Sequence, residues 1–512
     1  MRIRTGLTGL VLLSAATLSG LALPYGAQTA AAAGCTAGTE SDFNGDGIRD
    51  TAIGDPLAAV GGAERAGLVR VVLGGGKGVS EISQATAGMN ATPEAGDHFG
   101  LSMATYDADA DGCTDLVVGA PYEDIPVGGA NLVDAGAVYV IHGSVSGIGT
   151  GSPIDDYSQQ GFDPTTATEA NDWFGFALAA GKTSSGQPYL AIGVPGENVG
   201  DVADAGGIHY AQATTKTTVT EDDAGVPGAA EAHDRFGYAL TATPRYLAVA
   251  APGESIGDKT FAGGVAVFNH TLTNGVPTAL AGLDQEQPGI SGSAETGDGF
   301  GTAISLAPYR PSGAASETDV LLAIGVPNED VGTAADAGLI QVVQIPSSGA
   351  YKEVNAADRG TTDVEGDPTA GDFFGQRVAI ANTAPGSVGT AATMKLAVGV
   401  PGHDVTGASD AGAVQVLPAL GAAGASDKIL ARGGGILPGT AAQRDFAGMG
   451  LAVSATDLYV GVPYGKSAGE SSGVVYVLPW AVAGGGTGTV RTLKPGADGI
   501  PDAGRSFGAV IR

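Results

Sequence analysis

Apolar and polar residues alternate along this chain in short runs of five or six residues, separated by turns rich in Gly, Pro and Asp. A period of two is typical of β-strands with one buried face, and no helical period competes with it. One such run ends in Gly-x-Pro and recurs seven times, with alanine in place of glycine in the fourth copy, at residues 53–56, 118–121, 192–195, 249–252, 324–327, 398–401 and 460–463. The pattern predicts a repetitive, all-β fold.

Two further signatures recur with the first. Asp-x-Phe-Gly stands at residues 97–100, 172–175, 234–237, 298–301 and 372–375, with weaker copies at 445–448, interpreted as carrying an extra residue, and at 505–508, which lacks Asp. A small-residue turn opens an alternating strand at residues 67–73, 134–141, 204–210, 262–268, 336–343, 410–417 and 472–478. The phenylalanines of the Phe-Gly motif are predicted to pack between repeats; they are Phe99, Phe174, Phe236, Phe300, Phe374, Phe446 and Phe507.

The order of these signatures predicts a closed ring. A repeat of about 60 to 75 residues with several short strands fits one blade of four antiparallel strands, so residues 42–512 are predicted to form a seven-bladed β-propeller. The chain starts with a Gly-x-Pro strand and ends with a Phe-Gly strand. We therefore expect the last strand to complete the first blade, because this closure removes two free sheet edges.

Phe-Gly followed by Gly-Ala-Pro, as in Gly119-Ala120-Pro121, is the signature of the FG-GAP repeat. Residues 42–512 resemble the repeats of the integrin α-subunit head and of the C-terminal propeller of glycosylphosphatidylinositol-specific phospholipase D. The resemblance implies that the Phe-Gly strand is the innermost of each blade, that the Gly-Ala-Pro strand is the second, and that calcium loops lie between them. It implies a binding partner only loosely.

Two acidic loops follow the pattern Asp-x-Asx-x-Asp-Gly-x-x-Asp. Oxygen side chains at positions 1, 3, 5 and 9, glycine at 6 and a backbone carbonyl at 7 wrap a single calcium ion, whereas magnesium demands a stricter octahedron. The alternative is a pair of turns capped by Asx side chains, which leaves the carboxylates repelling one another. The sequence predicts two Ca²⁺ sites, formed by Asp42, Asn44, Asp46, Ile48 and Asp50, and by Asp107, Asp109, Asp111, Cys113 and Asp115.

The N-terminal residues predict export. Arg2 and Arg4 precede an apolar run over residues 10–23 and a small-residue stretch ending at Ala33, so residues 1–33 are predicted to be a signal peptide and residues 34–41 a short N-terminal segment. A transmembrane anchor and a lipid anchor on Cys35 are the alternatives. Because the chain is predicted to be secreted, its two cysteines are expected to form a Cys35–Cys113 disulfide that clips the N-terminal segment onto the second calcium loop, with the Cys113 side chain pointing outward.

Charge limits the possible partners. The formal net charge is −30, and without Arg2 and Arg4 it is −32, since 22 basic residues then face 54 acidic ones. Such a surface repels nucleic acid and anionic membranes, so a neutral or cationic extracellular protein or glycan is expected, bound by a monomer. Because successive strands of an antiparallel blade run in opposite directions, the loops after the second strands lie on the face opposite the calcium loops. The acidic residues of these loops form either a ligand face or solvated turn caps. They are Glu123, Asp124, Glu197, Glu254, Glu329, Asp330 and Asp404.

The six histidines are scattered through the repeats, with no spacing typical of a metal or catalytic site, and the sequence contains no Gly-x-Ser-x-Gly elbow or phosphate loop. The prediction is therefore an extracellular adhesion or recognition protein. The alternative is a phospholipase-like or esterase-like hydrolase with its site on a propeller face, and a structural surface protein is a third class.

Overall fold

The computed structural model describes residues 34–36, 38–466 and 472–512. The predicted signal peptide, residues 1–33, lies outside the described residues. The chain divides into two units, Met1–Gly34 and Cys35–Arg512, and every strand of the described residues belongs to the second. Among the described residues, no helix has the length and apolar character needed to cross a membrane.

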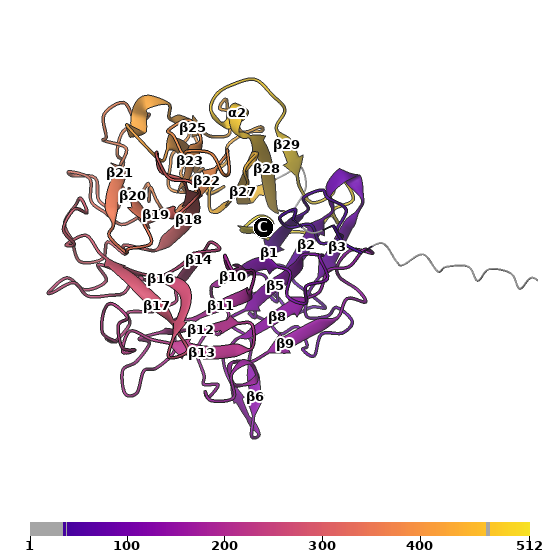
Figure 1. Ribbon diagram of the computed structural model, residues 1–512. Coiled ribbons are helices and arrows are strands. Elements are labelled where there is room, and N and C mark those ends of the chain that lie inside the picture. The colour runs from indigo at the N-terminus through magenta and orange to yellow at the C-terminus, as the bar shows by residue number, and fades with distance from the viewer. Residues whose placement is uncertain (1–33, 37, 467–471) are drawn as a thin grey trace, which may run out of the picture. The chain divides into compact units, whose positions relative to one another are not determined.

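The unit Cys35–Arg512 is a ring of seven four-stranded antiparallel sheets, which confirms the predicted seven-bladed β-propeller (Figure 1). We number the blades in ring order and give the strands of each from the innermost outward. Blade 1 contains β30 (Val510–Ile511), β1 (Thr51–Asp55), β2 (Leu68–Val72) and β3 (Val79–Ile82); blade 2 contains β4 (Ser102–Tyr106), β5 (Asp115–Ala120), β8 (Ala137–Ile141) and β9 (Ile154–Tyr157). Blade 3 contains β10 (Leu178–Lys182), β11 (Pro188–Val194), β12 (Gly207–Gln212) and β13 (Thr215–Val219); blade 4 contains β14 (Ala239–Ala242), β15 (Tyr246–Ala251), β16 (Gly264–Thr273) and β17 (Val276–Leu283).

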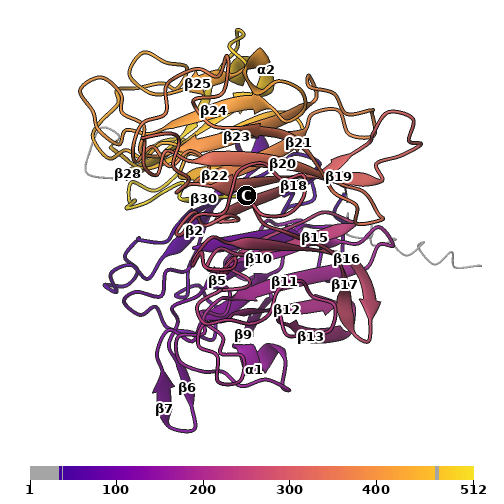
Figure 2. The same ribbon diagram turned by 90° about the vertical axis from the view of Figure 1, so that its left-hand side faces the viewer.

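The last three blades repeat this order. Blade 5 contains β18 (Ala303–Tyr309), β19 (Asp319–Val326), β20 (Leu339–Ile345) and β21 (Lys352–Ala357); blade 6 contains β22 (Arg377–Asn382), β23 (Met394–Val400), β24 (Ala413–Pro418) and β25 (Lys428–Leu430); blade 7 contains β26 (Gly450–Val453), β27 (Asp457–Lys466), β28 (Ser472–Pro479) and β29 (Arg491–Leu493). A separate hairpin, β6 (Ile125–Val127) and β7 (Ala130–Leu132), projects from blade 2 (Figure 2). The short helical turns are α1 (Gln159–Phe162), α2 (Trp480–Ala483), Gly74–Gly76 and Ala423–Ala425.

The ring closes as predicted. β30 pairs antiparallel with β1, with Ile511 opposite Ile53 and Val510 opposite Gly54. Ala52 and Arg512 exchange two backbone hydrogen bonds of 2.8 Å. The C-terminal strand is thus the innermost strand of the blade that the N-terminal part of the propeller begins.

The paired glycines of the two motifs let neighbouring blades approach closely. A Cβ atom on Gly193, in the second strand of blade 3, would lie 2.1 Å from the carbonyl oxygen of Gly237, which follows Phe236 at the start of blade 4. Gly237 itself has a φ of 93°, which L-residues with a side chain rarely adopt. Glycine in Gly-x-Pro is therefore required by backbone contact between blades.

The motif phenylalanines fill the spaces between blades, with one exception. Six of them are fully or almost fully buried: Phe99, Phe174, Phe236, Phe300, Phe374 and Phe507. The prediction for Phe446 was wrong, because Ala447 occupies the core position. Ala447 pairs with Gly412 in the same way that Phe236 pairs with Gly206, and Ala447 is fully buried whereas Phe446 is half-buried. Residues 445–448 therefore contain no insertion; they are an Asp-x-Phe-Gly motif with alanine in place of phenylalanine.

Candidate functional site

The two acidic loops lie at the same end of their blades, directly before the second strand, and each is anchored by its last aspartate. Asp50 accepts hydrogen bonds from the backbone N–H groups of Phe43 (2.9 Å) and Gly74 (2.7 Å). Asp115 accepts them from Ala108 (2.7 Å) and Gly143 (2.9 Å). Both aspartates are fully buried, and burial raises the pKa of Asp50 to about 6. The ninth loop position thus ties each loop to the turn after the third strand of its own blade.

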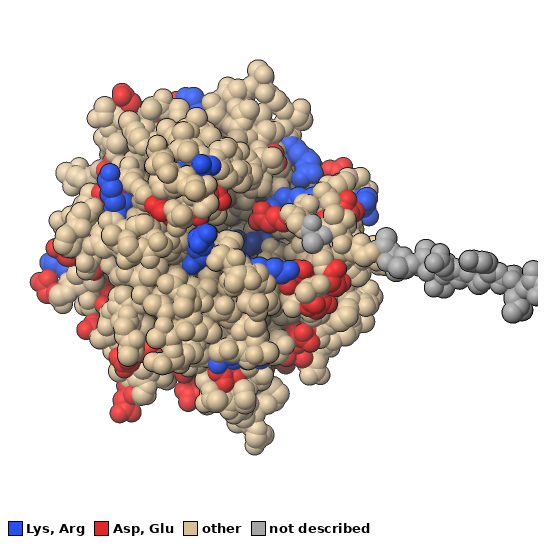
Figure 3. Space-filling view, in the orientation of Figure 1, with Lys and Arg blue, Asp and Glu red and all other residues tan. Residues whose placement is uncertain are grey.

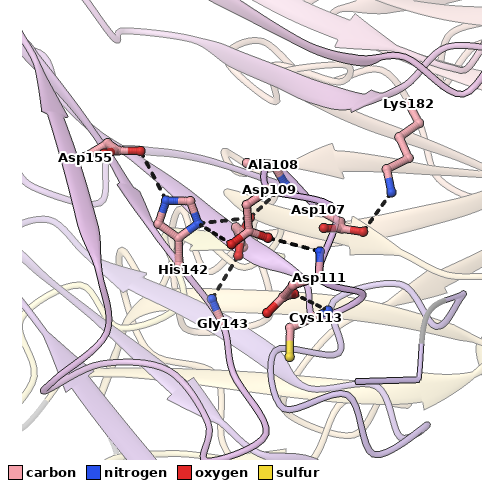
Figure 4. A network of polar contacts seen from close by, with 10 residues as sticks. Asp107, Ala108, Asp109, Asp111, Cys113, His142, Gly143, Asp155 and Lys182 are labelled. Atoms are coloured by element: carbon pink, nitrogen blue, oxygen red, sulfur yellow. Dashed lines mark hydrogen bonds and ion pairs between the residues drawn. The ribbon is translucent and has the colours of Figure 1, made fainter. Parts of the chain in front are cut away.

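The second loop gathers three carboxylates around one point (Figure 4). The side-chain oxygens of Asp107, Asp109 and Asp111 lie within 4.8 Å of one another. Asp109 accepts a hydrogen bond from the Asp111 N–H at 3.2 Å, which keeps the loop tightly curled. The Lys182 ammonium group lies 2.7 Å from Asp107 Oδ2. Oxygens that ligate one calcium ion at about 2.3–2.6 Å lie at most about 5 Å apart, so this set fits the ion.

The first loop has the same construction. Asp42 accepts hydrogen bonds from the N–H groups of Asp46 (3.1 Å) and Gly47 (2.7 Å), and Asn44 Oδ1 also accepts from Asp46 at 3.2 Å. The Lys77 ammonium group lies 2.6 Å from Asp46 Oδ2 and is the largest cause of the lowered pKa of that carboxyl. In both loops an exposed lysine therefore forms an ion pair with an aspartate of the predicted ligand set. A bound calcium ion would replace the lysine ammonium group.

The Cys35–Cys113 disulfide is confirmed. The Cys113 side chain bonds to Cys35 of the N-terminal segment, which covers it, so it is fully buried. Thr36 N–H donates to the Gly45 carbonyl at 2.9 Å, and Thr114 N–H donates to the Asp42 carbonyl at 2.9 Å. The bridge, the N-terminal segment and the two loops therefore form one connected structure. Ile48, proposed as a carbonyl ligand, exposes 43% of its surface.

His142 also belongs to the second loop site, and no sequence pattern indicates this. Its Nδ1 lies 3.3 Å from Asp115 and 3.7 Å from Asp109, and its Nε2 lies 3.1 Å from Asp155 (Figure 4). The neighbouring carboxylates of Asp115 and Asp155 raise the pKa of His142 to about 9. His142 directly follows the third strand of its blade, where blade 1 has Leu73, and no local motif connects that position with the loop.

On the opposite face, three of the proposed ligand-face glutamates are engaged between blades. Glu123, only 7% exposed, accepts a hydrogen bond from the Gln84 side chain. Glu197 accepts one from Gln159 at 2.6 Å, and Glu329 one from Gln285 at 2.8 Å. Burial raises the pKa of Glu123 to about 8 and that of Glu329 to about 7. Each of these three glutamates thus binds a glutamine at the outer end of the preceding blade. Glu254, the fourth glutamate of the proposed ligand face, faces Glu221 at that position instead.

The three aspartates of the proposed ligand face cap turns. Asp124, Asp330 and Asp404 each accept, at 2.9 Å, the backbone N–H of a residue that precedes the third strand of the same blade, namely Asp134, Asp336 and Asp410. These hydrogen bonds are the ones expected if the aspartates cap turns, which is the alternative to a ligand face. Asp330 and Asp404 nevertheless remain exposed to solvent.

A row of aromatic side chains crosses blades 2 to 4 on the face that carries these glutamates. Their ring centroids are 5.2, 6.1, 6.0 and 4.9 Å apart in succession, and we call them the aromatic row: His98, Tyr122, Trp173, Phe176 and Tyr238. All five are half-buried. Four of them flank or belong to the Phe-Gly motifs, so they lie beside the innermost strands, and the Arg235 guanidinium stacks on Trp173 at 5.3 Å from the ring centroid. The row therefore presents π-faces that already bind a cation of the protein itself.

Other histidines have structural roles. His209 packs edge-on against Phe162 and Phe174, and burial lowers its pKa to about 4. His270 bridges the Tyr210 hydroxyl and the Thr243 carbonyl, both at 2.8 Å. His209 is therefore part of the packing between blades 2 and 3, and His270 is part of the packing between blades 3 and 4.

The fold and the comparisons define a class of protein: this chain is a seven-bladed β-propeller that contains an FG-GAP repeat. The FG-GAP repeat model matches residues 99–141, which run from Phe99 through the second acidic loop to the end of β8. Phosphatidylinositol-glycan-specific phospholipase D of Bos taurus is 33% identical over 162 residues, covering 31% of this chain and 18% of that protein. Integrin alpha-PS2 of Drosophila melanogaster is 34% identical over 162 residues, covering 30% of this chain and 11% of that protein.

The chain therefore matches less than a fifth of the length of each of these relatives. Among solved structures, the Saccharomyces cerevisiae protein Sqt1 superposes with a TM-score of 0.40 at 9% identity, covering 77% of this chain and 75% of that one. This likeness is too low to bear on function.

Proposed function

We propose that this protein is a secreted, calcium-binding recognition protein of the extracellular space, whose partner is a neutral or cationic protein or glycan. A structural disulfide supports an oxidising location. The net charge of −30 disfavours nucleic acid and anionic membranes. The hydrolase alternative rests on the name of the bovine relative, of which the chain covers 18%.

Each acidic loop binds one calcium ion in this proposal. In the second loop the ligands would be Asp107, Asp109, Asp111, the Cys113 carbonyl and Asp115; in the first they would be the corresponding residues from Asp42 to Asp50. Binding neutralises carboxylates that the loop holds close together, and it releases Lys77 and Lys182. Because the loops contact each other through Asp42 and Thr114, calcium would stiffen the junction at which the N-terminal segment is clipped to the propeller.

The observation that carries the recognition proposal is the aromatic row. Half-buried aromatic rings beside the innermost strands offer a cation–π surface, and the surrounding acidic residues attract positive charge from a distance. Figure 3 shows the other face of the ring, which carries the acidic loops; there acidic side chains are spread around a central hollow, with basic side chains beside the hollow. A partner that inserts an arginine or lysine side chain among the rings fits both features.

Trp173 reports on this surface directly, because the only other tryptophan, Trp480, is 9% exposed and lies in the core. Titration with an arginine-containing peptide is expected to shift the Trp173 fluorescence in a saturable way. A cation–π contact contributes about 0.5–2 kcal/mol, so Trp173→Ala should weaken binding several-fold, measured by calorimetry. Phe261→Ala removes an aromatic side chain that is 48% exposed and outside the row, and this control should bind normally. Equal affinity in Trp173→Ala would rule out the aromatic row as the binding surface.

A further inference from the structure

The junction between blades 3 and 4 contains three carboxylates that face one another. The side-chain oxygens of Glu221, Asp234 and Glu254 lie within 4.8 Å of one another. Glu221 is 7% exposed and Asp234 is fully buried. The two acidic loops lie at the other end of the blades, so this cluster is separate from the predicted calcium sites.

One oxygen of each of these carboxylates lacks a hydrogen-bond donor among the described residues, although the other oxygen of Asp234 accepts the backbone N–H of Glu231. In the part of the chain that the structure describes, Glu221 Oε2, Asp234 Oδ1 and Glu254 Oε2 are buried with no hydrogen-bond partner. Glu221 and Glu254 receive only repulsion from surrounding charges, and burial together with that repulsion raises the pKa of Glu221 to about 9 and that of Glu254 to about 8. Buried charges without compensation are costly, so the site calls for a positive charge.

The other blade junctions show what belongs at this position. The residue two positions after the outermost strand is glutamine or arginine in the five other junctions that carry the motif aspartate: Gln84, Gln159, Gln285, Arg359 and Arg432. The three glutamines donate to the facing glutamate. Arg359 and Arg432 pair with the motif aspartates Asp372 and Asp445 at 2.5 and 2.8 Å. Glu221 occupies the same position, but its carboxylate can only accept hydrogen bonds, whereas the glutamine or arginine at each equivalent position donates them.

Space for a bound ion and its water lies next to the cluster. A cavity of about 110 Å³ is lined by Glu221, Glu254, Gly228 and Asp284, together with apolar residues of blade 4. This volume holds several water molecules, and calcium completes a shell of 6–8 oxygens with water and carbonyl groups. A Cβ on Gly228 would lie 2.6 Å from Glu221 Oε1, so the backbone approaches the carboxylate closely from that side.

We propose that Glu221, Asp234 and Glu254 bind one calcium ion between blades 3 and 4. The ion takes the place of the amide or guanidinium group that joins the other blades, and it links the outer end of blade 3 to the inner end of blade 4. All three ligands are carboxylates, which favours a hard cation over zinc or copper.

The test is calcium binding by equilibrium dialysis of the chelator-stripped protein, in the natural chain and in an Asp46→Ala/Asp111→Ala background that disables both loops. Glu221→Gln should remove one equivalent of calcium in each background, because it restores the amide found in blades 1, 2 and 4. The variant should also unfold at a higher temperature than the natural chain when calcium is absent, and calcium should then stabilise the loop-disabled form no further.

Asp258→Asn is the matched control, since it removes an acidic charge from the loop that carries Glu254, on a side chain that is 88% exposed. This variant should keep its full calcium content. The proposal is overturned if Glu221→Gln leaves the stoichiometry unchanged, or if the loop-disabled chain binds no calcium. Failure of the two acidic loops to bind calcium would leave the loss caused by Glu221→Gln visible in the natural chain, so the two claims are tested separately.

Discussion

Phe374→Ala is expected to lower the free energy of unfolding by about 3–5 kcal/mol, whereas Phe446→Ala is expected to cost less than about 1 kcal/mol. Phe374 is fully buried in a core cluster that joins blades 5 and 6, where it packs with Ile340, Leu396 and Val398. Truncation there leaves a cavity that close-packed neighbours fill only in part. Phe446 is half-buried and meets Tyr464 edge-on at a centroid distance of 5.9 Å.

Denaturant unfolding of the two variants, with and without calcium, measures this difference. The comparison is sharp because both phenylalanines lie in copies of the same motif. Equal destabilisation, or a larger loss for Phe446→Ala, would contradict the assignment of Ala447 to the core position of its repeat.

Deletion of residues 506–512 is expected to open the ring and to destabilise the protein by more than the loss of a single core phenylalanine. The deletion removes Phe507, which is fully buried, and all of β30. It also exposes the edge of β1, whose unpaired N–H and C=O groups would promote aggregation. The midpoint of thermal unfolding should fall markedly, and light scattering should detect association.

A synthetic peptide of residues 501–512 provides the control for the deletion. Added to the truncated protein, it should occupy the place of β30, bury Phe507 again and raise the unfolding temperature. An unchanged unfolding temperature in the truncated chain would contradict closure by the C-terminal strand.

The fold was predictable because its determinants are local and repeated seven times. Glycine in Gly-x-Pro and glycine in Phe-Gly are recognisable in sequence since each must be free of a side chain where blades meet, as Gly193 and Gly237 show. The error at residues 445–448 arose because that segment contains both Phe446 and Ala447. Only the backbone pairing of Gly412 with Ala447 decides which of the two points into the core.

A candidate site could be predicted from the sequence only where all of its residues lie in one loop. The two acidic loops hold their ligands within nine residues, so spacing alone indicates them. His142 reaches the second loop from the turn after another strand, and Glu221 meets Asp234 and Glu254 across a blade junction. No single motif contains these sets. Their importance emerges only when equivalent positions, such as Gln159 and Glu221, are compared in three dimensions.

Calorimetric titration of the chelator-stripped protein with calcium tests the central claim, that two acidic loops on one face of the propeller are calcium sites. Asp46→Ala and Asp111→Ala should each remove one equivalent, and the double variant should remove two, whatever the junction between blades 3 and 4 contributes. A double variant that binds as much calcium as the natural chain would show that both loops are only capped turns, and the calcium-dependent part of the account would be wrong.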